Sequence, residues 1–289
     1  MAWIESTILH TENRSAAQYE HMCVFMVPRH NFGRMGTRVV EYELAGRAIL
    51  MKPIAEESRA RVLAVYDAAA ATYNQVGPSF FLHFGKRLAG SAGIVPGSRV
   101  LDVATGTGAV LVPAAELAGH EGRVVGIDMS SPMISRARTE IGKCGLNNAD
   151  VLVADGESLP FPQESFDCVF CSFAIFLFSD LSSLLSECHR VLISTGRVGL
   201  VYSAGDDHNW DWFEQLISRY APAASLGTER YSPQYVEATL KHLGFTNVET
   251  RVEVHSIMFS DASEFWGWAW SHGDRGVLES LTGNHSEFK

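Results

Sequence analysis

The chain has 289 residues, of which 46% are hydrophobic and 19% are charged, a balance that excludes a wholly disordered chain. The formal net charge is −10, from 33 acidic and 23 basic residues, so we do not expect the basic surface that nucleic-acid binding requires. No stretch approaches the ~20 uninterrupted apolar residues of a membrane span. We therefore expect a globular protein that acts on a small molecule, with neither nucleic acid nor a membrane span.

The five cysteines are odd in number and irregularly spaced, which argues against a disulfide framework. Cys168 and Cys171 form a C-x-x-C pair inside an apolar run, and no second pair exists, so buried thiols on a strand are favoured over a metal site. The N-terminus lacks the apolar segment of a secretion signal. These features predict a cytoplasmic protein without a metal.

Residues 1–53 contain short apolar clusters but no sustained period, so we expect an N-terminal arm over this range. An ordered arm, serving as a lid or as the contact in a homo-oligomer, and a poorly ordered extension both fit its composition. Residues 56–73 are alanine-rich and predict a helix. Residues 79–89 predict a second helix, because their aromatic residues recur at helical spacing.

Residues 99–110 predict a buried strand, a glycine turn and the start of a helix, and the rest of the chain is organised around them. Gly106 and Gly108 let the backbone approach a ligand at the carboxyl end of the strand. Leu111 stands where a dinucleotide-binding turn has its third glycine. Asp102 would repel a pyrophosphate and attract a cation. A turn that only packs a helix on a sheet remains an alternative.

Two further strands also end in carboxylates. Residues 123–128 form a predicted strand that ends in Asp128, whose side chain could accept hydrogen bonds from both hydroxyls of a ribose. Residues 149–154 form the next strand, which is followed by Asp155. The fourth strand covers residues 166–173, and the fifth covers 198–203 after a helix over 181–192. A helix over 131–141 lies between the second and third strands.

After the fifth strand, a loop predicted to overhang the ligand crevice carries His208 and Trp210. His208 is a candidate general base, although a solvated loop histidine is the favoured interpretation. A helix over 233–243 follows, and an aromatic helix begins near residue 259. Trp266 and Trp270 share one face of that helix, which indicates either a lipophilic substrate pocket or a cap packed on the core.

The spacing Asp102-x-x-x-Gly106-x-Gly108, followed by Asp128 and Asp155, resembles the motifs of class I S-adenosylmethionine (SAM) methyltransferases. The ubiquinone/menaquinone-biosynthesis and natural-product group is the most similar, because the leading helix ends in Tyr73-Asn74. The resemblance implies an α/β Rossmann-like sheet with helices on both faces, a helical N-terminal arm and a cap. It implies SAM as the cofactor, a tyrosine over the cofactor at Tyr73, and an adenine-contacting acid at Asp155.

The resemblance also implies a domain organisation: an arm over 1–53, a SAM-binding core over 54–205, and a substrate cap with the end of the sheet over 206–289. The family's final antiparallel strand has no counterpart near the C-terminus. Either residues 252–258 supply an extra strand, or the sheet keeps six strands and an exposed edge. The residues expected to bind the cofactor are Tyr73, Asp102, Ala104, Thr105, Gly106, Gly108, Asp128, Met129, Asp155, Gly156, Ser172 and Phe173.

The predicted function is methyl transfer from SAM to a small, lipophilic or aromatic metabolite, with an oxygen, nitrogen or carbon acceptor. Two alternatives stay open at this point. One is a methyltransferase-like protein that binds SAM but acts only as a partner, and the other is an NAD-linked oxidoreductase.

Overall fold

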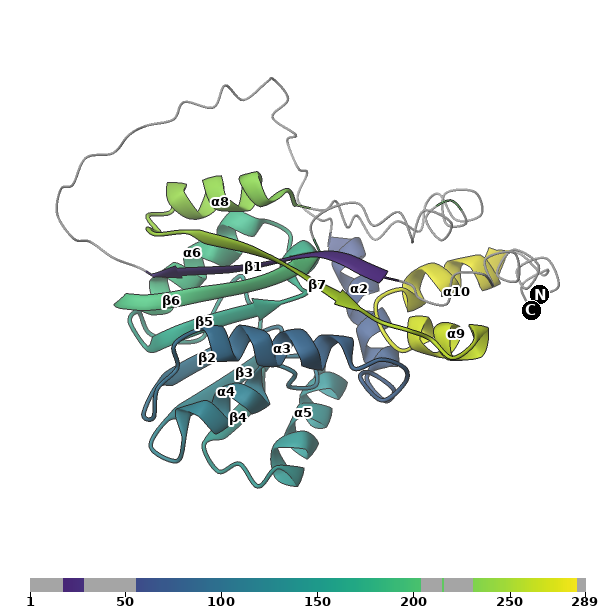
Figure 1. The fold of residues 1–289 in the computed structure, drawn as a ribbon, viewed down its shortest axis with the longest axis horizontal. Helices are drawn as coiled ribbons and strands as arrows, with labels where there is room; N and C mark the ends of the chain where they lie inside the picture. Colours follow the sequence, from purple (N-terminus) through teal and green to yellow (C-terminus); the bar gives the residue numbers. More distant parts are fainter. Residues whose placement is uncertain (1–17, 29–55, 204–214, 216–230, 285–289) are drawn as a thin grey trace, which may run out of the picture.

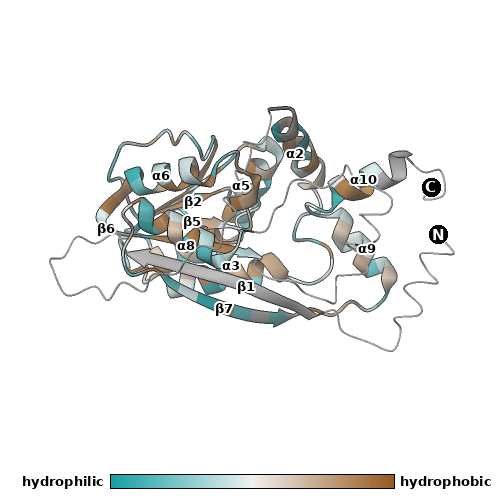
Figure 2. Cartoon of the chain, turned by 90° about the horizontal axis from the view of Figure 1, so that it is seen from above, coloured by the Kyte–Doolittle hydropathy of each residue, from teal (hydrophilic) through white to brown (hydrophobic). Residues whose placement is uncertain are grey.

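A computed structural model describes residues 18–28, 56–203, 215 and 231–284 (Figure 1). Its centre is a seven-stranded sheet with the strand order β4-β3-β2-β5-β6-β1-β7. Helices cover both faces of the sheet, and the hydrophobic colour in Figure 2 is concentrated on the central strands β2 and β5. Among the described residues, no helix is long and apolar enough to cross a membrane.

Five neighbouring strands are parallel, as the sequence predicts. The strands are β2 (Arg99–Val103), β3 (Arg123–Asp128), β4 (Ala149–Val153), β5 (Phe166–Ser172) and β6 (Leu192–Ser203). Their apolar runs are continuous because both faces are covered. Cys168 and Cys171 lie buried on β5 as free thiols. The α/β Rossmann-like fold is therefore confirmed, and parallel strands bring their carboxyl ends to one edge.

Of the remaining two strands, the one at residues 249–256 confirms the alternative in which residues 252–258 supply an extra strand, whereas the one at residues 18–28 was not predicted. Strand β1 (Gln18–Pro28) runs antiparallel between β6 and β7 (Glu249–Ser256). The expectation of an arm is thus wrong for residues 18–28, which belong to the sheet, and so is the expectation of a six-stranded sheet. The apolar run at residues 22–27 suits a strand with a neighbour on each side. The rest of the predicted arm lies outside the described residues.

The helices form two layers. On one face, α3 (Phe80–Ser91), α4 (Leu111–Ala118) and α5 (Ser131–Lys143) pack against one core cluster. On the other face, α6 (Leu181–Val191) and α8 (Pro233–His242) pack against a second cluster. Alternate strand residues feed the two clusters, because successive side chains point to opposite faces. Helices therefore cover both faces of the sheet, and a ligand can bind only at the ends of the strands.

Three helices lie beyond the carboxyl ends of the parallel strands (Figure 1). They are α2 (Glu56–Ala69), α9 (Ala262–Trp270) and α10 (Arg275–Asn284). Helix α2 packs against both α5 and α10. The sequence predicted α2 and α9 but not α10. A short 3-10 turn, η1 (Ile175–Leu177), follows β5 at the same end.

Candidate functional site

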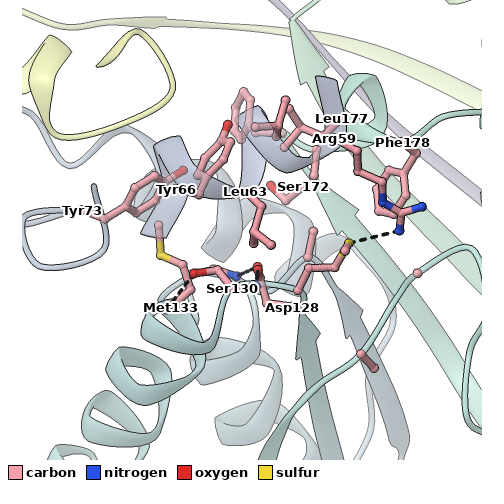
Figure 3. Close-up of a pocket in the computed structure, with 18 residues that line it drawn as sticks. Arg59, Leu63, Tyr66, Tyr73, Asp128, Ser130, Met133, Ser172, Leu177 and Phe178 are labelled. Carbon is pink, nitrogen blue, oxygen red and sulfur yellow. Dashed lines mark hydrogen bonds between the residues drawn. The ribbon is translucent and has the colours of Figure 1, made fainter. Parts of the chain in front are cut away.

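A pocket opens at the carboxyl ends of the parallel strands, beneath α2 (Figure 3). Its volume is about 780 Å³ when the solvent at its open mouth is included, so the enclosed part is much smaller. A smaller cavity continues from it along the glycine turn, and both share Tyr73, Ala104, Gly106, Ser172 and Phe173. Together they form one elongated groove.

The glycine turn between β2 and α4 forms the floor of this groove. Gly106 has φ 53°, and a Cβ placed on it would meet no heavy atom within 4 Å. The neighbouring Ala104 also has a positive φ, of 55°, which is rare for a residue with a side chain. The backbone is therefore held in an unusual conformation that leaves room for a ligand against Gly106.

Asp102 at the end of β2 lies under the smaller cavity, with only 1% of the residue exposed. One carboxylate oxygen accepts a hydrogen bond from Thr105 Oγ1 at 2.6 Å. The other oxygen, Oδ1, is buried and accepts no hydrogen bond of good geometry among the described residues, although the nearby backbone N–H of Leu111 favours the ionised carboxylate. Burial raises the pKa of Asp102 to about 7. An unsatisfied buried carboxylate of this kind is suited to a cationic ligand.

Asp128 at the end of β3 lines the larger pocket. Its carboxylate accepts hydrogen bonds from the backbone N–H of Gly106 and of Ser130, both at 2.9 Å. Burial raises the pKa of Asp128, against the opposing effect of these two bonds. The bonds fix the carboxylate at the junction of the two cavities, where its remaining lone pairs are available to a ligand.

Asp155 follows β4 and is paired with a residue that the sequence analysis missed. The Arg59 guanidinium on α2 binds Asp155 Oδ2 through Nη2 and Glu157 Oε2 through Nη1, the latter at 3.0 Å. Asp155 Oδ1 also accepts a hydrogen bond from the backbone N–H of Glu157 at 2.9 Å. Arg59 lines the larger pocket, and Asp155 lies beside it next to the lining residue Gly156.

Aromatic side chains form the roof and one wall. Tyr66 on α2 and Tyr73 after it both line the larger pocket, and burial raises the pKa of each hydroxyl. Tyr73 stacks on Phe81 with ring centroids 5.2 Å apart, and Phe81 and Phe173 are in edge contact at the same distance. This wall faces the smaller cavity, which Tyr73, Phe81 and Phe173 all line.

A buried histidine lies behind this wall, in the loop between α9 and α10. His272 is 4.0 Å from Trp268 and 5.8 Å from Phe81, measured between ring centroids. Its Nε2 has no hydrogen-bond partner among the described residues, and burial lowers the pKa of His272 to about 3. Asp274 Oδ2 lies 3.9 Å from His272 Nδ1, and desolvation by the surrounding protein raises the pKa of Asp274 to about 7.

Most residues predicted to bind a cofactor come together at this groove. The lining residues are Tyr73, Asp102, Ala104, Thr105, Gly106, Asp128, Met129, Gly156, Ser172 and Phe173. Gly108 lies in the same turn with φ 94°, and Asp155 lies at its rim. Lining residues from α2 were missed, although Arg59, Leu63 and Tyr66 recur at helical spacing. That period alone does not say whether a helix faces a core or a pocket.

The predicted substrate and catalytic residues are not gathered in the same way. His208 and Trp210 lie outside the described residues. Trp266 and Trp270 are half-buried on α9 and pack against the core cluster, and neither is among the residues that line the two cavities described above. The Arg275 guanidinium lies 5.6 Å from the centre of the Trp270 ring.

Comparison with known proteins identifies the family to which this chain belongs. A family model described as a methyltransferase domain matches residues 100–196. Nocamycin O-methyltransferase of Saccharothrix syringae is 33% identical over 228 residues, which cover 73% of this chain and 81% of the relative. The chain belongs to the class I SAM-dependent methyltransferases. SAM is therefore the methyltransferase's cofactor, and the chain is an enzyme of the small-molecule type.

Two further similarities agree with this assignment. A ubiquinone/menaquinone biosynthesis C-methyltransferase of Francisella philomiragia is 32% identical to the methyltransferase over 216 residues, covering 67% of this chain and 86% of the relative. A Bacillus halodurans crystal structure described as a methyltransferase superposes with a TM-score of 0.51 and 25% identity, covering 71% of this chain and 86% of that chain. The assignment displaces the NAD-linked alternative.

Proposed function

We propose that this methyltransferase transfers the methyl group of SAM to an oxygen of a small aromatic or lipophilic metabolite. The observation that carries the proposal is the aromatic wall of Tyr73, Phe81 and Phe173, which borders the cavity next to Asp102. Flat apolar rings bind well against such a wall, because aromatic pairs favour stacked and edge-to-face contacts. The Saccharothrix relative is named for O-methylation, which supports an oxygen acceptor.

The chemistry of the groove fits SAM from Asp102 to Gly156, and the acceptor would lie between the bound SAM and the aromatic wall. We assign the ammonium of the methionine part to Asp102, whose buried Oδ1 needs a positive partner, and the ribose hydroxyls to Asp128. The open space at Gly106 admits the ligand against the backbone. Asp155 and Gly156 would border the adenine, and Tyr73 would cover the cofactor. When bound, SAM supplies a methyl group on a positively charged sulfur.

The chain's own contribution is chiefly to position the two reactants. The roof from α2 and the aromatic wall exclude water from the groove and hold an acceptor in one orientation. Fixing reactants in this way can contribute ~7 to 11 kcal/mol in well-oriented systems. A carboxylic-acid acceptor is already ionised near neutrality, and a phenolic acceptor, with an ordinary pKa of about 10, releases its proton to bulk water as the methyl group moves from sulfur to oxygen. The proposal therefore does not require a dedicated base, and His208 remains a prediction.

The test is methyl transfer itself. The purified protein is incubated with isotopically labelled SAM and a panel of phenols, enols and carboxylic acids of polycyclic aromatic compounds, and the products are analysed by mass spectrometry. We expect a product that carries one labelled methyl group on oxygen. A product labelled on carbon would support the C-methyl alternative suggested by the Francisella relative. Binding of SAM without any labelled product would support a non-catalytic partner.

A further inference from the structure

We infer that Arg59 is a cofactor-site residue that fastens α2 over the adenosine end of the groove and thereby limits the rate at which the cofactor is exchanged. The inference rests on the position of the cofactor proposed above. Helix α2 supplies Arg59, Leu63 and Tyr66 to one side of the pocket, while Asp128 lies on the opposite side (Figure 3). Met129, the residue after Asp128, also lines the pocket. The cofactor must pass between these two sides.

Arg59 makes contacts that join the two sides. Besides its ion pairs with Asp155 and Glu157, its Nη2 lies 3.1 Å from Met129 Sδ, the contact drawn in Figure 3. A guanidinium can hold two carboxylates at once, because its donors form a rigid planar fork. Lysine has no such fork. The contacts therefore depend on arginine at this position and not only on its charge.

The anchor on the far side is itself held rigidly. Glu157 Oε1 accepts hydrogen bonds from Ser179 Oγ and from the backbone N–H of Asp180, the second at 3.0 Å. Glu157 Oε2 remains for Arg59, and only 10% of the Glu157 side chain is exposed. Asp180 is the N-cap of α6. Arg59 thus ties α2 to a fixed point of the core.

Two other contacts hold the same segment farther along the groove. Ser130 Oγ donates to Asp67 Oδ1 at 2.6 Å, near the ribose acid Asp128. Asn74 Nδ2 donates to Thr107 Oγ1 at 3.0 Å, beside the glycine turn. Among the described residues, Arg59 supplies the side-chain contacts of the first turn of α2, so loss of these contacts should loosen that end while the other two contacts persist. Helix α2 would then move about the two remaining contacts, which would act as a hinge.

The ion pair between Arg59 and Asp155 is partly exposed to solvent. The side chains of Arg59 and Asp155 are 27% and 34% exposed, so water and salt compete for the pair. The adenosine part of the cofactor is uncharged, and Arg59 neutralises the chain's own acids instead. Its role is therefore to position α2, and its loss should change the rates of cofactor exchange more than the chemistry.

The experiment measures the dissociation rate of S-adenosylhomocysteine (SAH), the demethylated product, by stopped-flow displacement in the full chain. We compare R59Q and R59K with R61Q, the matched control, since Arg61 is an exposed arginine on the same helix. We expect R59Q to release SAH about tenfold faster, R59K to be intermediate, and R61Q to match the wild type. Added salt should speed release from the wild type more than from R59Q.

Equal release rates in R59Q and R61Q would overturn the inference, as would an equal salt dependence of release in R59Q and the wild type. If R59Q does not fold, E157Q provides the same test, because it removes the anchored carboxylate charge and leaves Arg59 in place. SAH binding needs no acceptor, so the result is independent of the proposed substrate. If the wild type does not bind SAH at all, the cofactor site itself is misplaced, and that outcome overturns both proposals.

Discussion

Asp102 leads to a quantitative prediction about pH. Burial raises the pKa of Asp102 to about 7. Just below pH 7, the ligand-free protein therefore keeps this carboxyl group largely protonated, whereas the same group exposed to water would be ionised. A bound ammonium favours the ionised carboxylate. Below pH ~7, binding of SAH must therefore release that proton, and its dissociation constant should rise about tenfold for each unit that the pH falls.

The substitution Asp102→Asn separates this effect from others. The amide can still accept the hydrogen bond from Thr105, but it has no charge for the ammonium. We expect binding to weaken by about 10- to 100-fold, which is the loss of one charge-assisted hydrogen bond, and the remaining affinity to be independent of pH between about 5.5 and 7.

The same residue destabilises the ligand-free protein. The pKa of Asp102 is 3.8 in the unfolded chain and about 7 in the folded protein. Because the folded state holds the proton more tightly, the protein has its full stability below the unfolded pKa and loses stability as the pH rises from there through about 7. The shift corresponds to at most about 4 kcal/mol. Ligand-free Asp102→Asn should therefore be the more stable protein at pH 8, by a few kcal/mol at most, in urea denaturation.

Isothermal titration with SAH in buffers of different ionisation enthalpy measures affinity and proton release together. The matched control is Asp274→Asn, because Asp274 also has a pKa of about 7 but is not among the residues that line the two cavities. We expect this control to keep the pH slope. A wild-type affinity that is flat with pH, or the same slope in Asp102→Asn, would refute the assignment of the ammonium to Asp102.

Three further predictions concern the groove and its surroundings. Asp128→Asn should weaken SAH binding at least about tenfold, and calorimetry showing unchanged affinity would contradict the ribose assignment. The amide can accept only one of the two backbone hydrogen bonds, so the substitution should also lower the unfolding free energy by about 1 to 3 kcal/mol. Gly106→Ala should lower stability by only about 1 to 2 kcal/mol, since Ala104 tolerates a similar φ, but should block SAH; an unaffected affinity would mean that the ligand lies elsewhere. His272 has a pKa lowered by burial to about 3, so its contribution to stability is present above the unfolded pKa of 6.5 and is lost as the pH falls from there through about 3. His272→Phe should flatten the acid side of the stability curve in urea denaturation, and an unchanged curve would count against this origin.

The parallel core and the acids at its edge could be predicted from sequence because their signals are local. A buried strand followed by a glycine turn fixes the positions of Asp102 and Gly106, and a carboxylate at the end of the next strand fixes Asp128. Parallel strands bring these residues to one edge by topology alone. Short-range patterns were therefore enough to locate the cofactor groove.

The parts that sequence reasoning missed depend on contacts between distant segments. Strand β1 pairs with β6 and β7, which lie more than half of the chain length away in sequence. No local sequence pattern identifies those partner strands. Arg59 meets Asp155 at a separation of 96 residues. The helix that carries Arg59 has an ordinary helical pattern, and only the packing of α2 against the sheet edge makes it a wall of the groove.

The most direct test of the whole account is a crystal structure of the protein with SAH. We predict that the ammonium lies within hydrogen-bonding distance of Asp102 Oδ1, that the ribose hydroxyls meet Asp128, and that the adenine lies beside Gly156 under α2. Density for SAH at any other place, or carboxylates that point away from the bound nucleoside, would contradict the account.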